Sequence, residues 1–141
     1  MKIVVLLPYN LNLMKKLLLL IVIFFGSQTI NAQSIVKWVP LSEYHELLSK
    51  TFHPTEEGNF GPIKEFSKEL NSKAEALDVA TIPQEYKNQK IETTLTLLKK
   101  QTKLVNDLVQ NKAPNVEIMR AFQDLHDIFH QIVMLCNPNN K

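Results

Sequence analysis

Four histidines are the residues of this sequence best suited to chemistry, and they form two pairs near opposite ends of the chain. His126 and His130 are four residues apart, a spacing that places both imidazoles on one side of a helix. His45 and His53 form the other pair. A neutral imidazole binds Zn, Cu, Ni or Fe through one nitrogen, while another group orients its second nitrogen. The two pairs therefore predict a transition-metal site, provided that the fold brings them together.

We expect all four histidines to serve as metal ligands, with zinc as the first choice of ion and copper as the second. His126 and His130 form the predicted chelating pair, and His45 faces them. His53 lies eight residues from His45, so it joins only if the helix unwinds before Pro54 or the next segment folds back. That segment also supplies Glu56 and Glu57 as candidate oxygen ligands, and Glu57 is the alternative to His53.

The same residues permit a structural interpretation. The face shared by His126 and His130 also carries Met119, Phe122, Phe129 and Val133. Buried imidazoles on such a face are commonly hydrogen-bonded members of a helix–helix interface. The alternative is therefore a metal-free interaction module, an adaptor whose protein partner the sequence does not identify.

Several other chemistries lack their motifs. Covalent haem attachment requires Cys-x-x-Cys-His, and Cys136 is the single cysteine, which also excludes an internal disulfide. A haem held by His45 and His126 is a further alternative, although Phe122 and Phe129 would crowd it. A hydrolytic zinc helix carries His-Glu-x-x-His, whereas Asp127 follows His126 here. We therefore expect a binding protein and not an enzyme.

Residues 1–32 have the pattern of a secretory signal peptide. Lys15 and Lys16 precede an apolar run over 17–25, and small polar residues lead to a predicted cleavage after Ala32. The run is shorter than the roughly 20 residues that span a membrane. Removing this segment takes away three lysines and no acids, so the net charge of +2 becomes −1. We expect a soluble periplasmic or secreted protein without stable membrane insertion and without affinity for nucleic acid.

The remaining residues, 33–141, predict one all-α domain. The chain has only 3 glycines, and apolar residues recur at helical spacing. We expect helices over 41–52, 62–77, 83–111 and 116–136. Ser42 is the predicted N-cap of the first helix and Pro54 its end, while Pro62 and Pro83 begin the second and third helices. Segment 53–61 is predicted to be the only long irregular connection.

Four amphipathic helices with short connections predict an antiparallel up-down-up-down bundle. In this topology the first and fourth helices are neighbours. With a rise of about 1.5 Å per residue, His45 and His126 lie at depths that agree within one turn. All four histidines then fall on one helix–helix seam.

Two stretches also carry a resemblance to a known class of proteins. They are Tyr44-His45-Glu46, continued by Thr51 to Phe60, and Leu125-His126-Asp127-Ile128-Phe129-His130. Across residues 38–136 the chain resembles small exported bacterial four-helix bundles, similar to cytochrome c-prime and the periplasmic b-type bundle cytochromes but without their haem attachment motif. The resemblance implies a periplasmic, cytochrome-like bundle in which His45, His53, His126 and His130 could bind a transition metal.

Overall fold

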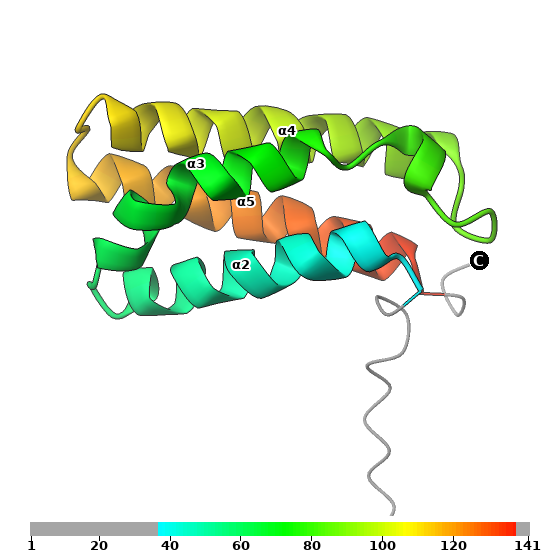
Figure 1. Cartoon of the computed structure of the whole chain (residues 1–141), viewed down its shortest axis with the longest axis horizontal. Helices are drawn as coiled ribbons and strands as arrows, with labels where there is room; N and C mark the ends of the chain where they lie inside the picture. Colours follow the sequence, from blue (N-terminus) through cyan, green and yellow to red (C-terminus); the bar gives the residue numbers. More distant parts are fainter. Residues whose placement is uncertain (1–36, 138–141) are drawn as a thin grey trace, which may run out of the picture. The chain divides into compact units, whose positions relative to one another are not determined.

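The computed structural model describes residues 37–137, which fall within one compact unit of the chain. Within this range the protein is all-helical and contains no strand, which confirms the predicted all-α class (Figure 1). The predicted signal peptide, residues 1–32, lies outside the described residues. The elements, in chain order, are α2 (Val39–Glu56), α3 (Gly61–Glu75), the short 3-10 helix η1 (Val79–Thr81), α4 (Gln89–Gln110) and α5 (Asn115–Leu135).

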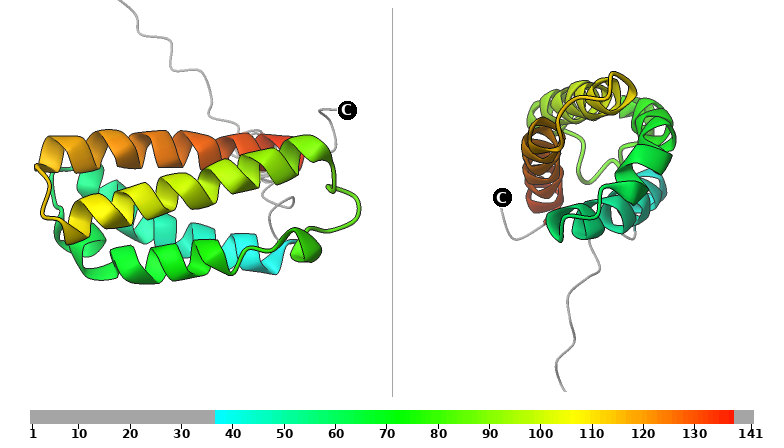
Figure 2. Two further views of the ribbon diagram at one scale, coloured as in Figure 1. Left: turned by 90° about the horizontal axis from the view of Figure 1, so that it is seen from above. Right: turned by 90° about the vertical axis from the view of Figure 1, so that its left-hand side faces the viewer.

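The four long helices lie side by side around one shared interior, as the end view in Figure 2 shows. Each helix packs against two neighbours: α2 contacts α3 and α5, and α4 contacts the same two helices. The contact between α2 and α5 joins segments that are far apart in the sequence, and it is the seam on which the histidines were predicted to meet.

The interior is filled by the apolar stripes that the sequence predicts. Ile63, Leu70 and Ala74 of α3 are fully buried, as are Ile91 and Leu98 of α4. The largest side chains in the core are aromatic and come mainly from the seam between α2 and α5. They are Trp38, Tyr44, Phe122 and Phe129.

Pro54 does not end the first helix, contrary to the sequence prediction. Helix α2 continues through it to Glu56. Proline removes one amide donor, here the partner of the Lys50 carbonyl, but the following turn has bonds of its own. The hydroxyl of Thr55 donates to the Thr51 carbonyl at 2.8 Å. The helix then closes in a Schellman motif, in which Asn59 donates to Pro54 at 2.9 Å and Gly58 donates to Thr55 at 3.0 Å.

The start of α2 also differs from the prediction. Ser42 lies inside the helix, and its amide donates to the Trp38 carbonyl at 3.1 Å. The helix begins at Val39 with Pro40 in its first turn, and no side chain caps it. Pro40 has the fixed φ that a first helical turn needs and lacks an amide that this turn would leave unbonded, so it favours the earlier start.

The prediction that a helix begins at Pro83 is wrong. The Pro83 carbonyl accepts from the amides of Tyr86 and Lys87, which makes a turn. The side chain of Asn88 then accepts from the amides of Lys90 and Ile91, at 3.0 Å each, and this N-cap fixes the start of α4 at Gln89. The long irregular connection is consequently 76–88 and not 53–61, because only 57–60 separate α2 from α3.

None of the helices within residues 37–137 has both the length and the apolar character needed to cross a lipid bilayer.

Candidate functional site

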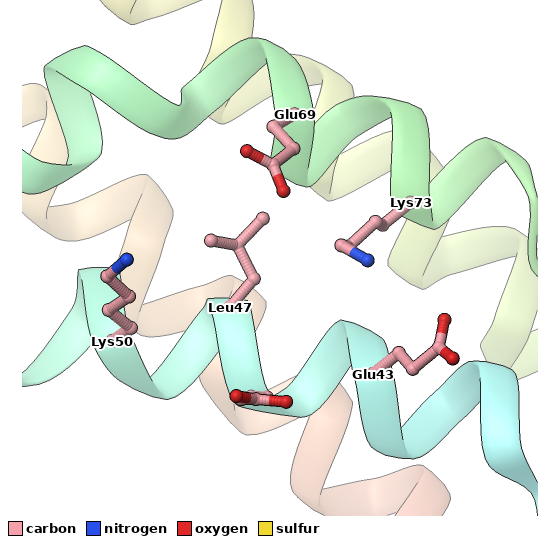
Figure 3. A pocket seen from close by; sticks show the side chains of 6 residues that line it. Glu43, Leu47, Lys50, Glu69 and Lys73 are labelled. Carbon is pink, nitrogen blue, oxygen red and sulfur yellow. The ribbon is translucent and has the colours of Figure 1, made fainter.

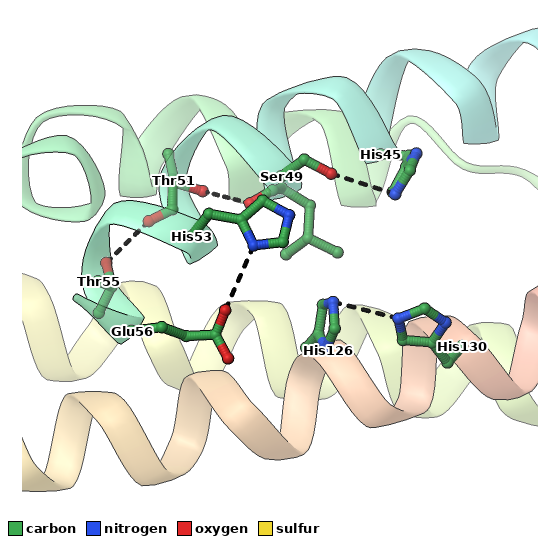
Figure 4. Close-up of polar contacts among 9 residues, drawn as sticks. His45, Ser49, Thr51, His53, Thr55, Glu56, His126 and His130 are labelled. Atoms are coloured by element: carbon green, nitrogen blue, oxygen red, sulfur yellow. Dashed lines mark hydrogen bonds and ion pairs between the residues drawn. The ribbon is translucent and has the colours of Figure 1, made fainter. Parts of the chain in front are cut away.

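Aromatic contacts define the seam between α2 and α5. Tyr44 lies beside Phe129, with ring centroids 6.1 Å apart, and Phe52 meets Phe122 edge-on at 5.2 Å. The contacts advance along α2 as they go back along α5, so these two helices run in opposite directions. Histidine side chains contact these rings on the same seam, and Figure 4 shows the four histidines on α2 and α5.

His126 and His130 are the two histidines that lie within direct contact. Their Nε2 atoms are 3.2 Å apart, and their rings are nearly perpendicular, at 82°. His126 is half-buried and His130 is exposed. A hydrogen bond between the two nitrogens requires one ring to carry its proton on Nε2 and the other on Nδ1. The predicted pair on one side of α5 is therefore present.

His126 also packs flat against Phe52 of α2, with ring centroids 4.0 Å apart and planes inclined by 9°. Burial lowers the pKa of His126, and the nearby His130 and His53 lower it further, while Glu56 and Asp127 act in the opposite direction. The neutral ring that results has a free lone pair on one nitrogen, which is the form that binds a metal ion.

His45 is held by two contacts. Its ring stacks on Phe129 at 4.6 Å with planes inclined by 3°, and its Nε2 lies 3.1 Å from the hydroxyl of Ser49. Burial is the main cause that lowers the pKa of His45, followed by the charges of His130 and His53. His45 thus lies on the predicted seam, but Phe129 covers one face of its ring.

His53 lies in the last turn of α2, because the helix continues past Pro54. Its Nδ1 is 3.3 Å from Oε2 of Glu56, and its ring centroid is 6.4 Å from that of His126. The helix therefore does not have to unwind for His53 to approach the pair on α5. Glu57 is the exposed C-cap residue of α2.

The structure brings the predicted residues together in part. All four histidines belong to the α2–α5 seam, and two of them are at contact distance. As the side chains stand, residues 37–137 contain no group of three or more His, Cys, Asp or Glu side chains placed to hold one metal ion. Cys136 is buried after the end of α5, and burial raises the pKa of its thiol to about 11.

Two side chains orient the histidines, and neither is predicted in that role from the sequence. Ser49 follows His45 by four positions and Glu56 follows His53 by three, and both spacings bring side chains together on a helix. The second pairing does not follow from the sequence, because Pro54, between His53 and Glu56, predicts the end of the helix. Local spacing alone predicts the contact of Ser49 with His45, whereas the contact of Glu56 with His53 also requires that the helix continue past Pro54.

A hollow of about 240 Å³ lies away from the histidines, between α2 and α3 (Figure 3). Leu47 is its only apolar lining residue, and charged side chains of both signs line the rest: Glu43, Glu46, Lys50, Glu69 and Lys73. With three carboxylates and two ammonium groups it has almost no net charge, and Lys50 is placed over the ring of Phe66 at 4.6 Å. It offers no convergent set of ligands comparable to the histidine pair.

Comparison with models of known protein families, with curated proteins and with solved structures finds no match.

Proposed function

We propose that this chain is an exported, antiparallel up-down-up-down four-helix bundle that binds a divalent transition metal ion at the α2–α5 seam. Zinc is the first choice and copper the second. The role is metal sequestration, sensing or delivery in the periplasm or outside the cell, without catalysis. The resemblance to small exported cytochrome-like bundles agrees with this proposal.

The observation that carries the proposal is the 3.2 Å separation of the Nε2 atoms of His126 and His130. Two nitrogens that share one tetrahedral zinc ion, each at about 2.0–2.1 Å, are about 3.3–3.4 Å apart. The separation of the pair therefore matches that of two ligands of one zinc ion, and the ring that carries its hydrogen on Nε2 must move it to Nδ1 before both nitrogens can bind. The lowered pKa of His126 supports the neutral, metal-binding form near pH 7.

The test is the metal content of the exported protein, purified without a histidine tag and analysed by elemental mass spectrometry. We expect about one equivalent of zinc or copper, lost in the His126→Ala/His130→Ala variant. The matched control is Gln123→Ala/Gln131→Ala, which replaces two exposed side chains of the same helix and should keep the metal. Trace metal in the wild type that does not rise after zinc or copper is added would overturn the proposal. The intact mass from the same sample tests cleavage after Ala32.

A metal-free interaction module is the second candidate, and one observation favours it. His45 and His126 both stack on phenylalanine rings with nearly parallel planes, as side chains of a structural seam do. In that case His126→Ala/His130→Ala leaves metal content unchanged, and adding zinc does not change the unfolding curve.

The residues present do not fit a haem held by His45 and His126. Phe129 lies flat on the first imidazole and Phe52 on the second, at centroid distances of 4.6 and 4.0 Å. A porphyrin between the two histidines would have to displace both rings from the core.

A further inference from the structure

We infer that the metal site is completed by His53, oriented by Glu56, so that the ion ties the last turn of α2 to α5 and keeps one position open to a small ligand from solution. This inference rests on the proposed function and deepens it. Three side-chain nitrogens, from His53, His126 and His130, supply the protein's ligands.

The contact between His53 and Glu56 is of the kind that orients a metal-binding histidine. Metal-binding histidines usually donate the hydrogen of their second nitrogen to a carboxylate, a backbone carbonyl or a water, which fixes the ring and its tautomer. In α2 the Nδ1 atom of His53 lies 3.3 Å from Oε2 of Glu56. A proton held there on Nδ1 leaves Nε2 as the free, metal-binding nitrogen. Figure 4 shows Glu56 and His53 on α2 above the side of α5 that carries His126.

The distances between the imidazole ring centroids can be compared with those expected around one shared ion. Three imidazoles bound through Nε2 to one tetrahedral ion have ring centroids about 5 Å apart, given zinc–nitrogen bonds of about 2.0–2.1 Å. The centroids of His126 and His130 are 4.4 Å apart, and those of His53 and His126 are 6.4 Å apart. One value is shorter and the other longer than the bound distance. Because no three His, Cys, Asp or Glu side chains within residues 37–137 are already placed around one ion, His53 has to move toward the pair on α5. Its side chain is 64% exposed and that of Glu56 is 46% exposed, so both can rotate together without disturbing the core.

The surroundings of His45 distinguish it from the other three histidines. Its Nε2 contacts the Ser49 hydroxyl at 3.1 Å, and Phe129 stacks on its ring. To ligate an ion at the His126–His130 pair through Nε2, His45 would have to give up its contact with Ser49, and its ring packs on Phe129 rather than on either imidazole of that pair. We therefore assign His45 a packing role.

The side chains around the inferred site are open to solvent. His130 is exposed, and the side chains of His53 and Glu56 are 64% and 46% exposed. An ion held by three histidines at such a surface has a fourth tetrahedral position that faces solvent. Open positions of this kind accept an outside donor, such as an imidazole or a thiolate, whereas closed sites with four protein ligands do not. Among the roles proposed above, this geometry favours exchange and delivery over permanent storage.

The experiment is a titration of the exported, metal-free protein with Co²⁺, whose visible absorption reports tetrahedral coordination, followed by competition with Zn²⁺. We expect Glu56→Gln to weaken zinc binding about 10–100-fold, as loss of an orienting group does. His53→Ala should weaken it further. The control His45→Phe keeps a ring to stack on Phe129 and should leave affinity unchanged. Free imidazole added to the Co²⁺ protein should shift the absorption of the wild type.

The outcomes separate this inference from the proposed function. If the wild type binds neither Co²⁺ nor Zn²⁺, the proposed function fails and the inference fails with it. If His126→Ala/His130→Ala abolishes binding but His53→Ala and Glu56→Gln do not change it, only the inference is overturned. It is also overturned if His45→Phe weakens binding, or if imidazole leaves the absorption unchanged, since the fourth position is then already filled by the chain. Circular dichroism of each variant confirms that the helices are intact.

Discussion

At the scale of single residues, one buried hydrogen bond links α2 to α4 through the core. The hydroxyl oxygens of Tyr44 and Thr102 are 2.8 Å apart, and the Thr102 hydroxyl also donates to the Leu98 carbonyl at 2.8 Å. A threonine hydroxyl has one hydrogen, so Tyr44 is the donor to Thr102. Burial raises the pKa of Tyr44, which keeps the phenol protonated and able to donate. The two partners are therefore not equivalent.

This asymmetry predicts unequal costs for two nearly isosteric substitutions. Tyr44→Phe removes the bond but leaves Thr102 bonded to Leu98, so we expect a loss of about 0.5–1.5 kcal/mol in the free energy of unfolding. Thr102→Val leaves the buried Tyr44 hydroxyl without this acceptor, so we expect a loss of about 1–3 kcal/mol. Urea unfolding of both variants measures the difference. A larger loss for Tyr44→Phe would show that the donor is assigned wrongly.

The histidines show how much of the candidate site the sequence could predict. The pairing of His126 with His130 follows from their spacing, because any helix places residues four apart together. The packing of His45 on Phe129 could not be predicted, since it depends on the relative rotation of two helices. The contact between His53 and Glu56 has helical spacing, but predicting it required knowing that the turn beyond Pro54 stays helical.

At the scale of elements, the end of α2 depends on one glycine. Gly58 has φ = +86°, the left-handed conformation that the Schellman motif needs at this position. A Cβ atom added there would meet no atom within 4 Å, so the only obstacle to a side chain is the backbone conformation. Any effect of a substitution therefore reports on φ and not on packing.

We expect Gly58→Ala to lower the free energy of unfolding by about 1 kcal/mol. The left-handed conformation costs about 1–2 kcal/mol for an L-residue, and part of this is offset because alanine restricts the unfolded chain. Gly58→Asn should cost less, since asparagine tolerates this region. Chemical unfolding of both variants is the measurement. Equal stability of Gly58→Ala and the wild type would mean that the turn changes conformation.

Helix ends were predicted less well than helix faces, and the reasons are local. Most residues of the apolar stripes of α3 and α4 are buried, while Phe66 and Leu108 are partly buried. Such stripes can be predicted because every residue contributes to the same periodic signal. The position of a helix end depends instead on local competition between capping of the helix and formation of a turn. At the start of α4 the side chain of Asn88 caps the helix, and the turn after Pro83 takes up the residues before it. Proline is compatible with either a first helical turn or a β-turn, so the sequence alone did not separate them.

At the scale of the whole molecule, the α2–α5 seam joins two helices that are far apart in the sequence. Its ring contacts, such as Phe52 with Phe122, hold α2 against α5 on the side of the proposed metal site. An ion bound by His53 of α2 and by His126 and His130 of α5 would cross-link this seam. The unfolded chain does not hold the three imidazoles together, so the metal binds mainly the folded state.

Zinc should therefore raise the stability of the whole domain by mass action. Above the dissociation constant each tenfold increase in free zinc adds about 1.4 kcal/mol, and zinc at 100 times that constant adds about 2.7 kcal/mol. For a domain of this size the melting temperature then rises by about 10 °C. Magnesium, which prefers oxygen ligands and octahedral geometry, should have no such effect. Thermal unfolding at a series of zinc concentrations measures how the melting temperature rises with zinc. The melting temperature of the His126→Ala/His130→Ala variant should not change with zinc. If the melting temperature of the wild type also stays constant, at zinc concentrations up to the millimolar range, the seam is not linked by a metal and the histidines have a packing role.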